Sequence, residues 1–354
     1  MPVSWAEGGL DLDALDRALL NAVQSQFPVV TRPYLELARI TGSGEEEAYE
    51  HMQNLRREGV IRRLGAVFDS HRLGYCSTLC AAKVPPDKVS LLADMLAGIA
   101  GVTHNYLREH IYNMWFTLIA PSQAAVEDTL VQLRRQSGIA DIYSLPATRL
   151  FKIKVDFDFN DETDDPECAT DVGKTVARPG VGGSGRKAAY ALTGQDIALV
   201  RILQGDLPHD LTPFATIAAN LGWAETEVLA RTGQLQAAGV IRRFGAVLRH
   251  QKAGFTANAM GVWQVPLERV EEVGAQMSAF REVSHCYQRP TLADWPYNLF
   301  TMVHGRSPAD CRHTMQAISK ATGIDDYDML FSVAELKKSS MQYFPEGGSL
   351  IGHT

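Results

Sequence analysis

Two stretches of the chain are near copies of each other and decide its architecture: residues 61–75 read IRRLGAVFDSHRLGY, and residues 241–255 read IRRFGAVLRHQKAGF. The second stretch begins 180 positions after the first. Other segments align in the same order: LDRALLNAVQ (15–24) with QDIALVRILQ (195–204), VTHNYLR (102–108) with VSHCYQR (283–289), and YNMWFT (112–117) with YNLFT (297–301). Because these matches are collinear, the sequence predicts a tandem duplication or fusion.

Each half opens with helical periodicity, in which apolar residues recur at helical spacing. The segments in the first half are 15–23, 31–40 and 42–57. Ser43 is a candidate N-cap of the third segment, Gly59 ends it, and residues 60–68 then alternate like a strand. Three short helices followed by a hairpin predict a winged helix-turn-helix. The second half repeats the pattern at 197–203, 214–221, 224–238 and 240–248.

The remainder of each half follows the order strand, helix, strand, strand, helix, strand. The segments are 76–84, 86–98, 102–108, 111–119, 121–137 and 141–154 in the first half, and 256–265, 267–280, 283–289, 297–304, 307–322 and 326–336 in the second. This order is the ferredoxin-like plan, with both helices on one face of the sheet. The chain is therefore predicted to be an α+β protein, a tandem duplication of a winged helix-turn-helix plus ferredoxin-like βαββαβ unit, which can form an internal pseudo-dimer.

These patterns give domain boundaries along the whole chain. The expected order is winged helix 1 (1–70), ferredoxin-like domain 1 (71–155), a linker (156–192), winged helix 2 (193–250), ferredoxin-like domain 2 (251–340) and a tail (341–354). The linker is acidic at first and then rich in glycine, with few large apolar residues. Such a composition cannot bury enough surface to fold alone, so we expect this segment to be flexible.

Charge and composition bear on the class of partner. The chain has 34 Lys and Arg against 41 Asp and Glu, a net charge of −7. The helices in the position of DNA-reading helices begin with acids, at Glu45–Glu47 in one half and at Glu225 and Glu227 in the other. Since acids at that end of the helix repel phosphates, no DNA partner is expected.

The expected location is the cytoplasm. The N-terminal segment MPVSWAEGGLDLDALD is acidic and has no apolar core, so it does not resemble a signal peptide. No run of 18 apolar residues predicts a membrane span. The five cysteines include no CxxC pair and are interpreted as free thiols in a reducing compartment.

A polar motif with the spacing His-x-Tyr-x-Arg occurs once in each half. Alternate residues of a strand lie on the same face, so each motif places three polar side chains together. We therefore take both motifs as candidate catalytic residues: His104, Tyr106 and Arg108, and His285, Tyr287 and Arg289. The alternative is a purely structural hydrogen-bond network at an interface between sheets.

Other polar residues are candidates for substrate binding. Two arginines lie in the predicted wing of each half, and the planar fork of arginine suits the binding of carboxylates. A solvent-exposed position on the hairpin, without a role in binding, is an equal alternative. The complete candidate set is Arg62, Arg63, Arg242, Arg243, His110, Tyr112, Asn113, Tyr297 and Asn298. The aromatic neighbours Trp115, Phe116, Trp295 and Phe300 could pack on a flat ligand, but a role in the core is the better expectation.

Taken together, the stretches IRRLGAVFDSHRLGY, HNYLREHIYNMWFT, IRRFGAVLRHQKAGF and SHCYQRPTLADWPYNLFT resemble the siroheme decarboxylases, within the Lrp/AsnC-like architecture. These are the NirD/NirL and AhbA/AhbB proteins of haem d1 and alternative haem biosynthesis, and a fused pair of halves resembles the NirDL type. The resemblance covers about residues 12–155 and 193–337. It implies a carboxy-lyase that removes two acetate carboxyls from siroheme to give 12,18-didecarboxysiroheme.

The resemblance also implies roles for the candidate residues. Arginines would hold carboxylates that do not react, because gripping the reacting one mainly stabilises the ground state. His104 and His285 would act as general acid or as ligands of the substrate iron, since imidazole suits both roles, and His110 and His304 are second choices. No cofactor is expected beyond the iron that enters with siroheme.

Two other functions remain open from the sequence: an Lrp/AsnC-type ligand-responsive transcriptional regulator, and a tetrapyrrole-binding sensor or carrier. Partners among related D, L, G and H type subunits, or a homo-oligomer, are also implied. No membrane partner is expected.

Overall fold

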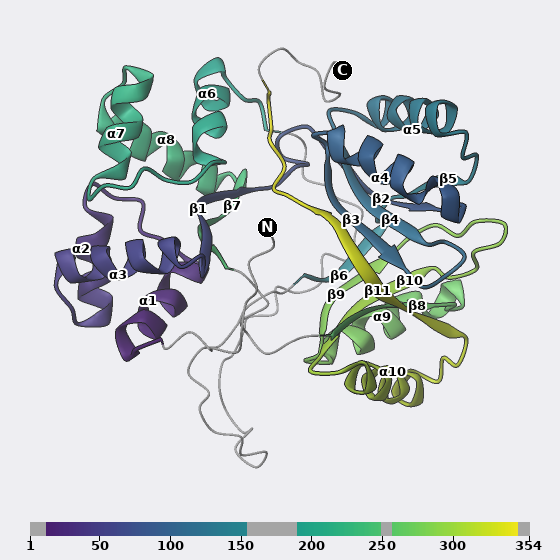
Figure 1. Cartoon of the computed structure of the whole chain (residues 1–354). Coiled ribbons are helices and arrows are strands. Elements are labelled where there is room, and N and C mark those ends of the chain that lie inside the picture. Colours follow the sequence, from purple (N-terminus) through teal and green to yellow (C-terminus); the bar gives the residue numbers. More distant parts are fainter. Residues whose placement is uncertain (1–11, 154–189, 249–256, 346–354) are drawn as a thin grey trace. The chain divides into compact units, whose positions relative to one another are not determined.

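A computed structural model describes residues 12–153, 190–248 and 257–345. The chain forms two compact units, one made of residues 1–72 and 156–253 and the other of residues 73–155 and 254–354. Each unit therefore takes corresponding segments from both halves of the duplication (Figure 1). The predicted linker 156–192 lies, except for its last three residues, outside the described residues.

The first unit, called here the winged-helix unit, contains the expected helices and one strand from each half. The elements are α1 (Ala14–Ser25), α2 (Pro33–Thr41), α3 (Glu45–Arg57) and β1 (Ile61–Phe68), then α6 (Gly194–Leu203), α7 (Pro213–Leu221), α8 (Glu225–Ala237) and β7 (Ile241–Leu248). Capping boxes begin α1 at Asp13 and α6 at Thr193. Ser43 is not the cap of α3, so that prediction was wrong. The cap is Gly44, whose N–H donates to the Glu47 carboxylate (3.2 Å).

The expected wing hairpin is wrong as well, because each wing strand pairs with the wing strand of the other half. Strands β1 and β7 are antiparallel, with Gly65 opposite Gly245. A Cβ at Gly65 would lie 2.5 Å from the Gly205 carbonyl oxygen, and one at Gly245 would lie 2.4 Å from the Val23 carbonyl oxygen. Glycine thus allows each strand to approach the end of the first helix of the opposite half, a contact between halves that no local sequence pattern reports.

The second unit, called here the sheet unit, contains both ferredoxin-like repeats. The first consists of β2 (Cys76–Ala82), η1 (Pro86–Lys88), α4 (Val89–Gly98), β3 (Val102–Arg108), β4 (Met114–Ala120), α5 (Gln123–Ser137), β5 (Ile142–Leu145) and β6 (Arg149–Ile153). The second consists of β8 (Ala257–Trp263), η3 (Leu267–Arg269), α9 (Val270–Ala279), β9 (Val283–Gln288), β10 (Leu299–Gly305), α10 (Pro308–Thr322) and β11 (Tyr327–Lys338). The predicted α+β tandem fold is confirmed.

Within the described residues the strands of this unit form one nine-stranded sheet, in the order β5-β2-β4-β3-β11-β8-β10-β9-β6. The prediction of a single strand over 141–154 was wrong: β5 pairs with β2 of its own half, whereas β6 pairs with β9 of the other half. Strand β11 also pairs with both halves, but as one continuous strand: residues 327–331 pair with β8 of its own half and residues 332–338 pair with β3 of the other half. Each half therefore ends beside a His-x-Tyr-x-Arg strand of the other half.

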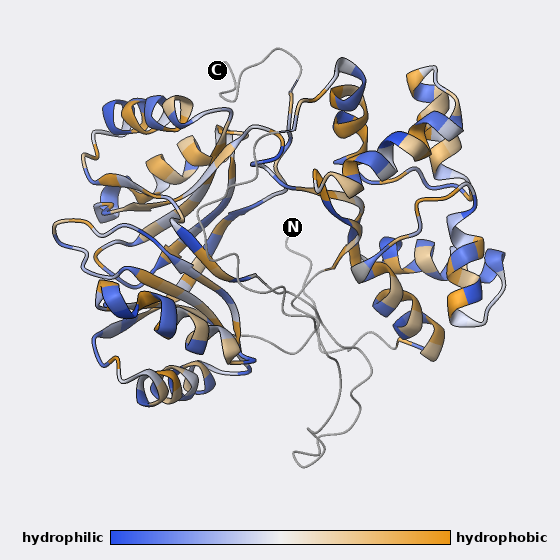
Figure 2. Ribbon diagram, turned by 180° about the vertical axis from the view of Figure 1, so that it is seen from behind, coloured by the Kyte–Doolittle hydropathy of each residue, from blue (hydrophilic) through white to orange (hydrophobic). Residues whose placement is uncertain are grey.

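The two faces of the sheet differ in what packs on them: the helices of this unit lie on one face, and none of its described helices lies on the other (Figure 2). On one face, apolar side chains of each half pack against that half's own helices, as Phe116 does in the first half and Val303 in the second. On the helix-free face, one buried cluster takes residues from both halves, including Trp115, Phe300 and Leu330. This shared cluster joins the two repeats, as expected for an internal pseudo-dimer. Across the described ranges, no helix has the length and apolar composition needed to cross a membrane.

Candidate functional site

Both His-x-Tyr-x-Arg motifs lie on the helix-free face of the sheet. Tyr106 of β3 is paired with Trp115, and Tyr287 of β9 is paired with Phe300. Trp115 and Phe300 belong to the buried cluster of that face, and directly paired residues point to the same side. We call His104, Tyr106 and Arg108 the β3 centre, and His285, Tyr287 and Arg289 the β9 centre. The histidines and tyrosines of both centres are half-buried.

A β-bulge precedes the histidine of each centre. The strand register shifts by one residue there, so that Thr103 and Ser284 are the extra residues. The Thr103 hydroxyl lies 3.0 Å from Nδ1 of His104, and the Ser284 hydroxyl lies 2.8 Å from Nδ1 of His285. Each imidazole also stacks on the tyrosine ring of its own centre, with centroid distances of 6.3 and 6.1 Å. These contacts hold the orientation of both imidazoles.

The arginine of each centre contacts the last strands of the opposite half. Arg108 donates to the Leu330 carbonyl (2.6 Å), and Arg289 donates to the Leu145 carbonyl (2.6 Å). The guanidinium carbons lie 5.5 and 4.9 Å from the tyrosine ring centroids of their centres. Burial lowers the pKa of both arginines to about 10, so both are cationic at neutral pH.

These two guanidiniums are buried cations without a carboxylate partner among the described residues. The Nε atoms of both are also buried and have no hydrogen-bond partner there. A buried charge is costly unless an opposite charge or hydrogen bonds compensate it. Each centre is thus suited to accept an anionic group.

The two centres differ beside the tyrosine. The Tyr106 hydroxyl donates to the Glu335 carboxylate (3.3 Å), and β11 places Glu335 directly opposite Tyr106. Burial, and then the nearby Glu335 charge, raise the pKa of Tyr106 to about 12. In the β9 centre the residue opposite Tyr287 is Leu150, whose side chain is exposed. The β3 centre therefore carries a carboxylate at a position where the β9 centre is apolar.

A second histidine adjoins the β9 centre. Nε2 of His304, on β10, lies 2.7 Å from the same Ser284 hydroxyl that contacts His285. Burial lowers the pKa of His304. The strand register places Ile119 at the corresponding position of the first half, two residues beyond Thr117, the partner of His104. Sequence reasoning missed the role of Thr103 and Ser284, although a hydroxyl residue precedes the histidine of both motifs.

The predicted residues His110 and Tyr112 lie in an aromatic cluster around Trp295. His110 accepts the Tyr112 N–H at Nδ1 (3.0 Å), and its Nε2 lies 3.6 Å from the Asp328 carboxylate. Burial lowers the pKa of His110. The buried Tyr112 donates to Asp294 (2.8 Å), and the half-buried Tyr297 packs edge-on against Trp295 with ring centroids 5.0 Å apart.

The two predicted asparagines bind backbone. Asn113 accepts from the N–H of Val84 (2.9 Å) and donates to its carbonyl (2.8 Å). Asn298 makes the same pair of bonds with Val265, at 2.9 and 2.7 Å. These contacts secure the chain after β2 and β8. The four aromatic residues Trp115, Phe116, Trp295 and Phe300 are all buried, in keeping with the expected core role.

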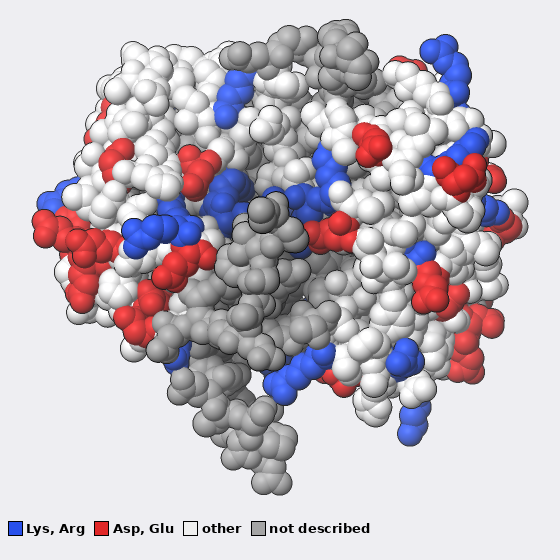
Figure 3. Space-filling model, viewed as in Figure 1, with Lys and Arg blue, Asp and Glu red and all other residues white. Residues whose placement is uncertain are grey.

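The four wing arginines separate into two pairs. Arg63 donates to the carbonyls of Gln204 (2.7 Å) and Gly205 (3.2 Å), and Arg243 donates to the Gln24 carbonyl. Each therefore binds the C-terminal end of the first helix of the other half, where cations are favourable. Arg62 and Arg242 are exposed. Figure 3 shows acidic and basic side chains interspersed on the face in view.

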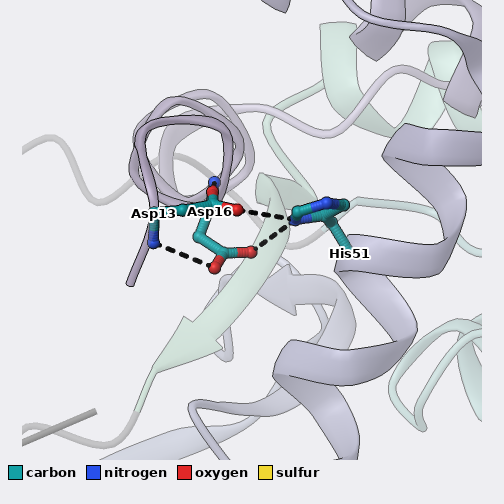
Figure 4. A group of neighbouring side chains, drawn as sticks. All are labelled: Asp13, Asp16 and His51. Carbon is teal, nitrogen blue, oxygen red and sulfur yellow. Dashed lines mark hydrogen bonds and ion pairs between the residues drawn. The ribbon is translucent and has the colours of Figure 1, made fainter. Parts of the chain in front are cut away.

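A cluster of two aspartates and a histidine lies apart from these centres, in the winged-helix unit (Figure 4). Nδ1 of His51 lies 2.9 Å from Asp16 and 3.8 Å from Asp13. The corresponding residue of His51 in the second half is Arg231, which lies 3.1 Å from Asp196. A nitrogen-bearing side chain thus contacts the aspartate of the first helix in both halves, so the cluster is explained as a capping network and not as a metal site.

Comparison with known proteins is consistent with this architecture. The family described as siroheme decarboxylase NirDL-like HTH domain matches residues 16–62 and 196–242, and the AsnC-like ligand binding domain matches residues 72–152 and 252–337. A siroheme decarboxylase from Hydrogenobacter thermophilus is 35% identical over 329 residues, which are 93% of this chain and 94% of that protein. The chain belongs to the siroheme decarboxylases of the fused NirDL type.

Two further siroheme decarboxylases illustrate the duplication and the ligand. The beta subunit from Methanosarcina barkeri is 50% identical over 147 residues, 42% of this chain and 97% of that subunit, and so corresponds to one half. The crystal structure of siroheme decarboxylase NirDL in co-complex with an iron-uroporphyrin III analogue has a TM-score of 0.71 and 32% identity, and covers 93% of this chain and 94% of that one.

Proposed function

We propose that this chain is a carboxy-lyase that removes two acetate carboxyls from siroheme and releases 12,18-didecarboxysiroheme and carbon dioxide, for haem d1 biosynthesis in the cytoplasm. The observation that carries the proposal is the similarity to siroheme decarboxylases over nearly the whole chain. The paired centres support it, because each combines an oriented histidine with a buried, cationic arginine that has no carboxylate partner among the described residues.

The reaction requires a proton but no electrons. Loss of carbon dioxide from an acetate arm leaves a carbanion-like carbon, over which the conjugated macrocycle spreads the charge. A proton then completes a methyl group, so that R–CH2–COO⁻ and H⁺ give R–CH3 and CO2. His104 and His285 are the proposed proton donors or ligands of the substrate iron. No cofactor other than this iron is proposed.

Arginines are proposed to hold carboxylates that do not react. Arg108 and Arg289 fit this role through their buried charge, and the exposed Arg62 and Arg242 are retained as further carboxylate ligands. Since Arg63 and Arg243 bind helix ends, their proposed contribution is to the fold of the winged-helix unit. His110 and Tyr297 remain proposed hydrogen-bond donors near the aromatic cluster. Tyr112 already donates its hydroxyl hydrogen to Asp294, and Asn113 and Asn298 support the strands.

Anaerobic incubation of the purified chain with siroheme, followed by mass spectrometry of the extracted tetrapyrrole, tests the function. Loss of two carbon dioxide molecules is expected. Unchanged siroheme that co-elutes with the protein would favour a sensor or carrier, and DNA binding without tetrapyrrole affinity would favour a regulator.

The role of each histidine is tested with His104→Ala and His285→Ala. A variant that loses turnover but leaves the absorption spectrum of bound siroheme unchanged has lost a proton donor. A variant whose spectrum changes has lost a ligand of the substrate iron. Full turnover in both variants would overturn the assignment of these residues.

One chain is proposed to suffice, because it contains both halves that other family members have as separate alpha and beta subunits. Light scattering of the active preparation, without added subunits, is expected to show a species built from this chain alone.

A further inference from the structure

The two centres are alike in motif, but only the β9 centre has a second imidazole among its described contacts. The Ser284 hydroxyl lies 2.8 Å from Nδ1 of His285 and 2.7 Å from Nε2 of His304. The bulge at Ser284 makes this possible, because it brings the hydroxyl next to the imidazole that follows it in sequence. His304 lies two residues beyond Met302, the partner of His285, and therefore on the same face of the sheet.

We propose that His304 is a positioning residue that acts through Ser284 to hold a proton on Nδ1 of His285, and that the β9 centre is consequently the one that protonates the substrate carbon. This inference rests on the proposed decarboxylation for its chemistry, whereas the hydrogen-bond chain itself is testable without substrate.

The direction of the hydrogen-bond chain follows from the protonated form of His285. A protonated His285 carries a hydrogen on Nδ1, which donates to the Ser284 oxygen. The hydroxyl then donates its own hydrogen to the nearer acceptor, which is Nε2 of His304 at 2.7 Å and not the Met302 carbonyl at 3.5 Å. His304 accepts this hydrogen at Nε2 when its own ring hydrogen is on Nδ1.

This arrangement leaves Nε2 of His285 as the nitrogen that delivers the proton. The His285 imidazolium gives its Nε2 proton to the carbanion formed when carbon dioxide leaves. His285 then remains neutral with its hydrogen on Nδ1, which is the form that the Ser284–His304 pair holds. Uptake of one solvent proton at Nε2 restores the imidazolium, so each methyl group formed consumes one proton and the histidine needs no change of tautomer.

The β3 centre differs from the β9 centre in two respects. The residue at the position of His304 is Ile119, whose side chain cannot accept a hydrogen bond. In addition, the Tyr106 hydroxyl donates to Glu335, which also pairs with Lys338 (3.5 Å), whereas Leu150 lies opposite Tyr287 in the β9 centre. We assign the β3 centre to binding the macrocycle, not to protonating it.

The experiment compares His304→Leu, His304→Gln and, as the matched change in the other centre, Ile119→Leu. Leucine cannot accept the hydrogen of the Ser284 hydroxyl, whereas the glutamine oxygen can. His304→Leu is expected to lower kcat about tenfold with little change in KM, His304→Gln to retain most of the kcat, and Ile119→Leu to leave kcat within about twofold. Equal kcat in the wild-type chain and in His304→Leu would overturn the proposal.

Nitrogen NMR of the imidazole rings supplies a readout that is independent of turnover. In the wild-type chain, neutral His285 is expected to carry its hydrogen on Nδ1, and in His304→Leu the two tautomers are expected to mix. Neutral His285 with its hydrogen on Nε2 in the wild-type protein would refute the proposed hydrogen-bond chain, whether or not the protein decarboxylates siroheme. A wild-type chain that shows the expected tautomer but releases no carbon dioxide would refute the proposed function alone.

Discussion

Replacing Arg289 with methionine separates a structural role of this arginine from a substrate-binding role. Methionine keeps much of the apolar stem and removes the charge and the donors. Burial lowers the pKa of Arg289 from 12.5 to about 10. At ~1.4 kcal/mol per pKa unit, keeping the charged form buried costs roughly 3 kcal/mol.

The contacts of Arg289 offset this cost. A hydrogen bond between a charged donor and a carbonyl, such as the one to Leu145, contributes roughly 1.5–3 kcal/mol. A guanidinium over an aromatic ring contributes about 0.5–1 kcal/mol, and Arg289 lies over both Tyr287 and Phe300. These contacts sum to about 2.5–5 kcal/mol against a cost of roughly 3 kcal/mol, so the charged arginine contributes no more than about 2 kcal/mol to stability.

We therefore expect Arg289→Met to change the free energy of unfolding by no more than about 2 kcal/mol and to weaken siroheme binding about tenfold or more, since charge-assisted bonds to carboxylates are lost. Urea unfolding followed by the fluorescence of Trp115, Trp263 and Trp295 measures the first quantity, and siroheme titration the second. Arg108→Met is the matched variant of the other centre and is expected to behave in the same way, because Arg108 makes the same type of contact with Leu330. A loss of 3 kcal/mol in stability with unchanged siroheme affinity would refute the reasoning and leave Arg289 as a structural link between halves.

Three further variants test separate parts of the structure. The hydrogen bond that His51 donates to Asp16 raises the pKa of His51. The stability that this pair contributes is therefore fully present below the unfolded pKa near 6.5 and is lost as the pH rises through the higher folded value. His51→Arg, which copies Arg231 of the second half, is expected to remove that loss in melting temperatures measured from pH 5 to pH 8, and an unchanged pH dependence would exclude this pair as its source. Gly274→Ala would place a Cβ 2.5 Å from the Phe151 ring and is expected to destabilise the sheet unit by about 1–3 kcal/mol in urea unfolding. The double variant with Phe151→Leu is expected to recover part of this stability. Unchanged stability of Gly274→Ala would mean that β6 does not pack on α9. Glu335→Gln keeps an acceptor for Tyr106 but removes a charge, and is expected to tighten siroheme binding a few-fold at low salt; weaker binding would show that the carboxylate itself serves the site.

The helices and most strands could be predicted because their signals are local. Capping residues such as Thr193 and the positive φ of Gly59 act within one turn, and the amphipathic pattern of each helix is contained in its own segment. The identity of the strand with which a given strand pairs is not encoded in that strand's own segment. The pattern of 141–154 is equally compatible with one strand or two, although Pro146, which has no N–H to donate, lies at the break between β5 and β6.

For the candidate site, too, contacts within one strand could be predicted and contacts between strands could not. Alternation along a strand correctly grouped His104 with Tyr106, and His285 with Tyr287, because that rule needs only one strand. The same rule places Ser284 on the face opposite to His285, and the bulge that cancels this is set by pairing with β10. Glu335 and His304 lie on other strands than the motifs they contact. These contacts depend on the register of strand pairing, which the sequence pattern does not show.

The most direct test of the account is to incubate the purified chain with siroheme in deuterium oxide, without oxygen, and to determine the mass of the tetrapyrrole product. The expected product has lost two carbon dioxide molecules and carries one solvent deuterium in each of two new methyl groups. Siroheme recovered with all of its carboxyls would contradict the proposed function, and decarboxylated product without solvent deuterium would contradict protonation by an exchangeable imidazole.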